Sequence, residues 1–392
     1  MKLYFDDTTF DGQLQRTAAK ASYAACDLGE MFAVASRITP GDYDSWYREW
    51  FAAGESNREL ADVEAAKGHT ESARQAYLRA SEYYRSAYFF SRRDPEGGAL
   101  LAAYRAARDT FRAAVPHLPF PTEHVQIPYD GVRLDGYVIT PPSGPSDKVL
   151  LWPAGYDSPV EEAYGLGAAE AAARGITVLA FEGPGQGGAL YELELPFRHD
   201  FEVVTSAVLD FVESRTDLSG ARVGMVGRSF GGYLAPRAAS KEPRLAAIAA
   251  DPAQSDMGAA FHKMFPPDWA PLLEKGDPAF NDEVWKAFPG VAGQEWWLSR
   301  AKSHGLSTPL AYVQEMAKWV VDVAAITCPT FVSYGEGDFA QVMTKDFYDR
   351  LTVSEKQFVM YREADGAGGH CEGMGPSRYF ADVLGWFEDR LR

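Results

Sequence analysis

The chain has 392 residues, which is enough for two domains or for one large decorated domain. Its 38 Lys and Arg residues against 55 Asp and Glu residues give a formal net charge of −17, which argues against nucleic acid and against an anionic membrane surface as partners. The three cysteines, Cys26, Cys328 and Cys371, are widely spaced and predict no disulfide framework and no zinc site. The N-terminus lacks the apolar segment of a signal peptide, and no apolar run reaches the roughly 18 residues of a membrane span. We therefore expect a cytoplasmic protein that acts on a small molecule.

The first part of the chain, residues 1–118, has a helical rhythm. Apolar residues recur three and four positions apart over 73–88 and again over 100–115. This pattern predicts a helical N-terminal (cap) domain of three to five helices. The prolines between 116 and 121 indicate a linker to a second domain.

The second part, residues 119–392, alternates strands with helices. Asp130-Gly131 separates two alternating segments and predicts a hairpin. Continuously apolar strands separated by helices, such as the alanine-rich helix expected over 163–174, indicate a mostly parallel sheet buried on both faces. The sequence thus predicts an α/β fold with an eight-stranded sheet. The expected strands are 125–129, 132–139, 149–152, 176–181, 223–226, 245–249, 330–334 and 357–361.

Residues 252–322 interrupt this alternation between the sixth and seventh strands. We expect a helical insertion there, in the place of a lid. Two interpretations stay open, because one insertion can do both: helices packed on the rim of the sheet, or an aromatic wall over an active site. The segment is rich in tryptophan, with Trp269, Trp285, Trp296, Trp297 and Trp319.

A nucleophile is predicted in Gly227-Arg-Ser229-Phe-Gly231, which follows an apolar strand and precedes a helix-like stretch. This is the strand, tight turn and helix that a G-x-S-x-G nucleophile elbow needs. The glycines, with Gly232 after them, let strand and helix backbones approach closely. We expect the Ser229 hydroxyl to project from the end of the sheet.

A serine needs a base to take its proton, and in this motif order the base comes last. Two late histidines have a usable context. His304 lies inside the insertion, and His370 lies in a glycine-rich loop just after the last strand. The position of His370 favours it as the base.

The acid that orients the imidazole should follow the strand before that loop. Asp338 comes directly after the strand over 330–334 and is our choice. The competitors are Glu336 nearby, Asp251 after the sixth strand, and Asp365 on the same loop as the base.

Two backbone N–H groups are needed to hold the oxyanion. We expect them from Phe230, which follows the nucleophile, and from Tyr156 in the loop after the third strand, where Gly155 gives the backbone room. The glycine-rich segment at 181–188 lacks the Gly-Lys-Ser/Thr end of a P-loop. It is interpreted as a sharp structural turn in which Glu182 is hydrogen-bonded to loop amides. No metal and no organic cofactor is expected.

Together these motifs resemble one branch of the α/β-hydrolases. That branch contains 2,6-dihydroxypseudooxynicotine hydrolase, the fungal yellowish-green-type polyketide-shortening hydrolases and a bacterial polyketide-trimming lyase. The resemblance covers nearly the whole chain. It is carried by the helix motif Tyr77–Ala87, by Gly155–Glu162, by Glu182–Gly187, by the turn at Ser229, and by Asp338 and His370.

The resemblance implies an α/β-hydrolase fold with Ser229, Asp338 and His370 as the triad. Several members cleave a carbon–carbon bond beside a ketone in a retro-Claisen sense, so a β-diketone or polyketide-like substrate is implied. Others are esterases, so hydrolysis of an ester or amide, or acyl transfer, stays open. Glu161 or Glu162 is implied as an auxiliary acid, although both could be ordinary acids in the first turn of a helix. Pairing of two chains through the helical domain, a homodimer, is also implied. A catalytically silent scaffold is the third hypothesis, which the complete Ser, Asp and His set disfavours.

Overall fold

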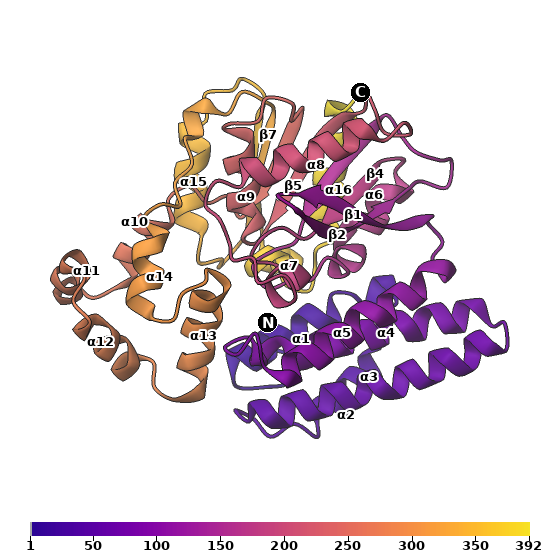
Figure 1. The fold of residues 1–392 in the computed structure, drawn as a ribbon, viewed down its shortest axis with the longest axis horizontal. Helices are drawn as coiled ribbons and strands as arrows, with labels where there is room; N and C mark the ends of the chain where they lie inside the picture. The colour runs from indigo at the N-terminus through magenta and orange to yellow at the C-terminus, as the bar shows by residue number, and fades with distance from the viewer. Residues whose placement is uncertain (1) are drawn as a thin grey trace.

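The computed structural model describes residues 2–392, and in this range eight strands form one sheet (Figure 1). The strand order is β1-β2-β4-β3-β5-β6-β7-β8. The pairs β1–β2 and β2–β4 are antiparallel, and every later pair is parallel. The expected mostly parallel sheet is therefore confirmed. The strands are β1 (Thr122–Tyr129), β2 (Val132–Ile139), β3 (Lys148–Pro153), β4 (Thr177–Phe181), β5 (Arg222–Arg228), β6 (Ala247–Asp251), β7 (Thr330–Gly335) and β8 (Lys356–Tyr361).

Helices cover both faces of the sheet, which explains why strands such as β4 and β7 are apolar throughout and buried at every position. Of the helices that alternate with the strands, three pack on one face of the sheet and two on the other. A further short helix follows β4. The helices on the first face are α8 (Glu202–Ser214), α9 (Gly231–Ala239) and α15 (Gln341–Arg350). Those on the second are α6 (Ala169–Ala173) and α16 (Ser377–Arg390), and α7 (Gly187–Tyr191) follows β4.

Helical residues cover 162–173, close to the helix expected over 163–174, but a kink at Leu166 and Gly167 interrupts them. A π-helical turn at Tyr164–Ala168 precedes the short α6, and Gly167 has a φ of 112°. A Cβ at Gly167 would lie 2.6 Å from the Phe380 ring and 2.8 Å from the Trp152 ring. Close packing against these two rings therefore decides the backbone here.

The helical region before the sheet has its own aromatic core, which includes Trp46, Trp50, Tyr83 and Tyr84. Helices α3, α4 and α5 lie side by side beneath the sheet in the view of Figure 1. The last turn of this region ends at His117, and β1 begins at Thr122. The helices are α1 (Thr8–Ala18), α2 (Leu28–Ala35), α3 (Tyr43–Ala66), α4 (Thr70–Tyr88) and α5 (Gly98–Ala114).

Between β6 and β7 the chain forms a group of helices at one side of the sheet, next to the helical region (Figure 1). Their own core contains Trp269, Phe280 and Trp297, which meet around Phe265. The helices are α10 (Met257–Met264), α11 (Ala270–Lys275), α12 (Ala279–Ala287), α13 (Gly290–Ser303) and α14 (Pro309–Met316).

A buried cluster of ion pairs joins the helical region to the sheet. Glu162, in the loop after β3, is bound by Arg16 of α1 through its Nε at 2.8 Å and by Lys20 at 2.5 Å. Lys20 also pairs with Glu82 of α4 at 2.8 Å, and Glu82 pairs with Arg85 at 2.6 Å. Burial alone would raise the pKa of Glu162, but Arg16 and Lys20 hold it well below its usual value. Glu162 is therefore charged at neutral pH and fixes two cations.

Replacing Glu162 with Gln should lower the free energy of unfolding by about 3 kcal/mol, because it removes the carboxylate that the buried Arg16 and Lys20 share and leaves each with one remaining acidic partner, Asp157 and Glu82. The stabilisation by Glu162 is present above the usual pKa of a glutamate and is lost as the pH falls below it. Urea denaturation at neutral pH measures the change. Glu71→Gln removes the more exposed pair with Arg74 and should cost no more than about 0.5 kcal/mol. Equal effects of the two substitutions would contradict the buried cluster as the tie between the two regions.

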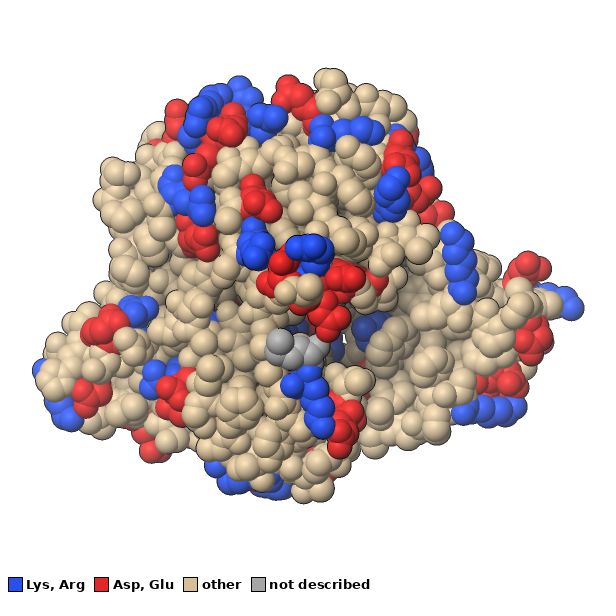
Figure 2. Space-filling model, turned by 180° about the vertical axis from the view of Figure 1, so that it is seen from behind, with Lys and Arg blue, Asp and Glu red and all other residues tan. Residues whose placement is uncertain are grey.

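Acidic and basic side chains are interspersed over the rear face of the molecule (Figure 2). Within residues 2–392, none of the helices is both long and apolar enough to span a membrane.

Candidate active site

Ser229 stands in a sharp turn between β5 and α9, with a left-handed φ of 56°. A Cβ at Gly227 would lie 1.9 Å from the carbonyl oxygen of Gly231, and one at Gly232 would lie 1.9 Å from that of Pro252. Only glycine therefore fits at these two positions. The backbone strain at Ser229 is held by the surrounding packing and by a hydrogen bond from its N–H to the carbonyl of β6.

Two hydrogen bonds connect three side chains from separate segments in a line from serine to histidine to aspartate. The Ser229 Oγ is 2.9 Å from the His370 Nε2, and the His370 Nδ1 is 2.7 Å from the Asp338 Oδ2. Asp338 follows β7 and is buried, and its other oxygen accepts the N–H of Ala340 at 2.8 Å. His370 lies in the loop after β8 and remains partly accessible. This arrangement can pass a proton from the serine to the imidazole while the carboxylate orients the ring.

The competing acids lie elsewhere. Glu336 accepts the N–H of Glu363 at 2.9 Å, and Asp365 binds the Arg362 side chain at 2.8 Å. Asp251 is the last residue of β6 and is buried beside Ser333, whose hydroxyl donates to it at 3.1 Å. None of these three carboxyl groups has a hydrogen bond to the imidazole in the described part of the chain.

The surroundings of His370 change its titration. Burial would lower the pKa of His370, whereas the neighbouring Cys371 and the hydrogen bond and charge of Asp338 raise it, and the net pKa lies well above its usual value. The exposed Phe339 ring stacks on the imidazole with 5.1 Å between centroids. The ring is thus held by a carboxylate on one edge and an aromatic face on one side.

Arg228, directly before Ser229, ties the turn to the loop that carries His370. Its guanidinium donates to the carbonyl of Cys371 at 2.7 Å and to Glu372 at 2.8 Å, and it lies 3.5 Å from Asp251. The contacts of Arg228 were not foreseen. The available signal was a basic side chain next to Ser229 in a motif otherwise made of small and apolar residues.

The loop after β3 lies next to the turn at Ser229. A Cβ on Gly155 would lie 3.7 Å from the Ser229 Cβ, and the Tyr156 ring lies 4.8 Å from the Phe230 ring between centroids. Within residues 2–392, the backbone N–H groups of Tyr156 and Phe230 have no acceptor. Both N–H groups expected as oxyanion donors therefore lie near Ser229 without a protein acceptor in the described residues.

The glycine-rich turn after β4 braces that loop. Glu182 accepts the N–H of Val160 at 3.0 Å and that of Gly188 at 2.6 Å, which confirms the structural role expected for this carboxyl group. The Gln186 amide donates to the carbonyl of Gly155 at 3.1 Å. The role of Gln186 was not foreseen, because its partner lies 31 residues earlier.

The two glutamates implied as auxiliary acids have different partners. Glu162 is held in the ion pairs with Arg16 and Lys20 described above. Glu161 accepts the Tyr137 hydroxyl at 2.9 Å, and its second oxygen has no partner within residues 2–392. Burial raises the pKa of Glu161, which favours its protonated form. Neither glutamate is hydrogen-bonded to the three aligned side chains.

Aromatic residues of the insertion reach the nucleophile turn. The Trp319 ring lies 5.3 Å from the Phe230 ring, and His304 lies 4.8 Å from Trp319. Neither ring nitrogen of His304 has a hydrogen-bond partner in the described residues, and burial lowers its pKa to about 3. His304 therefore serves as an apolar neighbour of the turn. Trp297 packs inside the insertion against Phe265, as expected for helices packed on the rim, and Trp319 contacts Phe230; an aromatic wall over the site stays a prediction.

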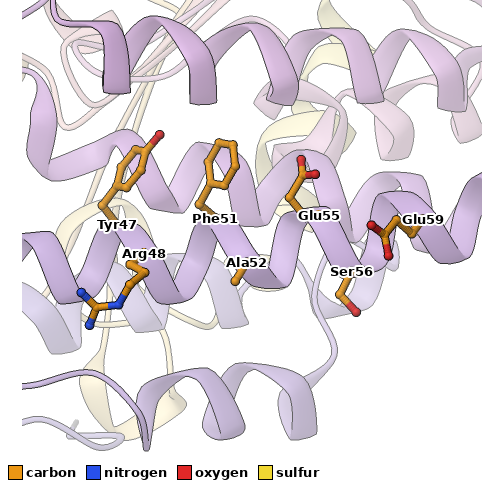
Figure 3. A pocket seen from close by; sticks show the side chains of 7 residues that line it. All are labelled: Tyr47, Arg48, Phe51, Ala52, Glu55, Ser56 and Glu59. Carbon is orange, nitrogen blue, oxygen red and sulfur yellow. The ribbon is translucent and has the colours of Figure 1, made fainter.

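A separate groove lies on α3, on the helical region (Figure 3). None of the side chains that line it belongs to the site around Ser229. They are Tyr47, Arg48, Phe51, Ala52, Glu55, Ser56 and Glu59.

Residues 149–383 match the model of the alpha/beta hydrolase family, and this range contains the aligned serine, aspartate and histidine. The chain belongs to the alpha/beta hydrolase family. Membership of this family makes the protein a hydrolase. The expected α/β-hydrolase fold is confirmed.

Curated relatives of this alpha/beta hydrolase come from fungi. It is 31% identical over 390 residues to hydrolase LUC6 of a Fusarium species, with 94% of this chain and 93% of the relative covered. It is 31% identical over 393 residues to 20-hydroxy-prefusarin hydrolase FUS2 of Gibberella moniliformis, again covering 94% and 93%. It is 38% identical over 263 residues to hydrolase acrC of Aspergillus aculeatus, covering 62% and 61%.

Solved structures share the fold at lower identity. The crystal structure of 2,6-dihydroxy-pseudo-oxynicotine hydrolase superposes with a TM-score of 0.72 and 21% identity, covering 95% of both chains. AbyA5 superposes with a TM-score of 0.64 and 21% identity, covering 91% of this chain and 89% of that one. At this identity the likeness establishes the fold of this alpha/beta hydrolase, including its helical N-terminal region.

Replacing Asp338 with Asn should lower the pKa of His370, because the carboxylate charge and its hydrogen bond favour the imidazolium. The transition from charged to neutral imidazole should therefore move to lower pH. Titration of the His370 ring protons by NMR measures the shift. Asp365→Asn, which removes a nearby carboxylate outside the line, should leave the pKa unchanged. A shift of the same size in both variants would refute the specific coupling of Asp338 to His370.

Proposed function

We propose that this alpha/beta hydrolase is a serine hydrolase that cleaves a carbon–carbon bond next to a ketone in a β-diketone or polyketide-like aromatic substrate. The observation that carries the proposal is the line from Ser229 through His370 to Asp338, with distances of 2.9 and 2.7 Å. Such a line activates a hydroxyl that is otherwise a weak nucleophile.

The proposed reaction uses these residues in the following order. Ser229 attacks one carbonyl carbon while His370 takes the hydroxyl proton, and Asp338 stabilises the imidazolium that forms. The N–H groups of Tyr156 and Phe230 hold the oxyanion. Collapse breaks the carbon–carbon bond and expels an enolate, which the second carbonyl stabilises and which takes a proton on carbon. Water, deprotonated by His370, then releases the acid from the acyl-enzyme.

The proton for the leaving carbon comes from His370 or from one of the two glutamates after β3. If a glutamate supplies it, the imidazolium returns its proton to that carboxylate, so that His370 is neutral again before it deprotonates the water. Of the two glutamates, Glu161 fits better, because burial raises its pKa and one of its oxygens is unpartnered within residues 2–392. Glu162 is held as an anion by two cations and suits a structural role. The motif resemblance over nearly the whole chain and the aromatic rings around Phe230 support a flat, ketone-bearing substrate. A relative named 20-hydroxy-prefusarin hydrolase supports a small-molecule substrate in general.

The alternative is a carboxylesterase, amide hydrolase or acyltransferase with the same three residues. It is favoured by the absence of a hydrogen bond between either glutamate and the aligned side chains in the described residues. An ester needs only His370 to protonate its leaving oxygen, whereas an enolate needs a proton delivered to carbon.

The wider organisation is proposed on the same basis. Residues 1–118 form a cap domain, residues 119–392 form the catalytic domain, and the insertion at about 252–322 is a lid over the site. A cytoplasmic location and a homodimer that pairs through the helical region remain predictions.

A paired kinetic assay tests the reaction: kcat/KM for an aryl 1,3-diketone and for an aryl ester of matched size. The diketone should be preferred, and Ser229→Ala should lower both values by at least about a thousandfold, because the nucleophile is lost. Ser240→Ala, at the end of α9, is the matched control and should leave both unchanged. A clear preference for the ester would reject the carbon–carbon reaction and keep the triad, and full activity of Ser229→Ala would reject both.

A further inference from the structure

Arg300, on α13 of the insertion, lacks a carboxylate partner within residues 2–392. Its Nη1 donates to the carbonyl of Trp296 at 2.9 Å, and its guanidinium lies 4.1 Å from the Trp296 ring centre and 5.8 Å from that of Tyr156. Its other N–H donors have no acceptor in the described part of the chain. Burial lowers the pKa of Arg300, but a guanidinium stays charged at neutral pH. Because Arg300 is only half-buried, its free donors can be reached from outside and can bind the oxygens of an anionic group.

The neighbouring charges do not compensate Arg300. Arg92 is buried beside the same loop, and its guanidinium is 3.9 Å from Asp157. Asp157 makes its close ion pair with Arg16 instead, at 2.8 Å. Burial alone would raise the pKa of Asp157, but Arg16 and Arg92 lower it to about 2, so this carboxylate is already ionised and engaged. Glu295, on the same helix as Arg300, pairs with Arg93 at 3.4 Å. The nearby carboxylates are therefore engaged by other arginines, and Arg300 is left without one.

Tyr156 connects Arg300 to Ser229. Its backbone N–H is a proposed oxyanion donor beside Ser229, while its hydroxyl donates to the carbonyl of Arg300 at 3.3 Å. Tyr156, Asp157 and Arg300 are each half-buried, so a ligand can reach them. Figure 2 shows a hollow between the helical region and the insertion, with basic side chains inside it. A ligand lying along the Tyr156 side chain would present one end to Ser229 and the other to Arg300.

We propose that Arg300, with Arg92 beside it, forms an anion-binding subsite for a planar oxyanion on the substrate, a carboxylate or an ionised enol. The fork of a guanidinium matches the two oxygens of such a group, and Trp296 and Tyr156 flank its conjugated plane. This deepens the proposed function, on which it rests, by making the substrate an acidic, conjugated molecule with its anionic end away from the scissile carbonyl. Arg300 is a specificity residue in this account.

Calorimetric binding to the Ser229→Ala protein tests the subsite without any turnover. The probes are 2-naphthoate and its neutral analogue 2-naphthamide. We expect the naphthoate to bind at least about tenfold more tightly than the amide. Adding Arg300→Gln should weaken the naphthoate about tenfold or more and leave the amide unchanged. Lys302→Gln, which removes a cation from the same helix, is the matched control and should leave both affinities unchanged.

A second arm separates the two sources of the oxyanion. Binding of benzoylacetone is measured below and above the pH at which its enol ionises. If the subsite binds ionised enols, the enolate should bind more tightly than the neutral form. If only the naphthoate binds more tightly than its neutral analogue, the subsite binds carboxylates. Arg300→Lys keeps the charge and loses the two-pronged guanidinium, so its affinity for the naphthoate should lie between those of the proteins with Arg300 and with Arg300→Gln. The lysine variant replaces the glutamine variant in the test if the latter does not fold. Equal affinity for naphthoate and naphthamide, no binding of the naphthoate, or equal losses in Arg300→Gln and Lys302→Gln would overturn the subsite. Because binding needs no nucleophile, these outcomes are separate from failure of the kinetic assay.

Discussion

The backbone turn at Ser229 is the constraint on which the rest of the site depends. Ser229 has a left-handed φ of 56°. A Cβ at Gly227 or Gly232 would lie 1.9 Å from a neighbouring carbonyl oxygen, so only glycine fits at these two positions. The turn places the hydroxyl at the ends of the parallel strands, where the segments after β7 and β8 also emerge. Asp338 and His370 can therefore come from distant parts of the chain and still meet Ser229 in one line.

The helical region is part of the scaffold of the site. Through Arg16 it holds Asp157 and Glu162, which flank the segment of the loop after β3 that follows Tyr156. The Gln186 side chain, from the turn after β4, donates a hydrogen bond to the carbonyl of Gly155. The loop that offers the Tyr156 N–H is thus fixed from two sides. Such preorganisation is what the proposed oxyanion site would require, because donors that must reorient would lose much of their effect.

Much of the fold and of the candidate site could be predicted from the sequence. Apolar strands and their alternation with helices are local patterns, and Ser229, Asp338 and His370 each follow a recognisable strand. The rest depends on contacts between distant segments. Arg228 binds the Cys371 carbonyl 143 residues later, and no local pattern reports that. The same holds for the break at Gly167, which two rings from other segments impose, and for Arg300, whose lack of a carboxylate partner in residues 2–392 appears only in three dimensions.

In the proposed reaction, Ser229 carries the acyl group of the substrate between the two half-reactions. Intact-protein mass spectrometry after rapid acid quench with an aryl 1,3-diketone, followed by peptide mapping, tests this role. We expect an adduct with the mass of the acyl half on the peptide that contains Ser229, enriched in a His370→Gln protein that retains slow acylation but deacylates more slowly still. Turnover of the diketone with no adduct, or with an adduct on another residue, would exclude Ser229 as the acyl carrier.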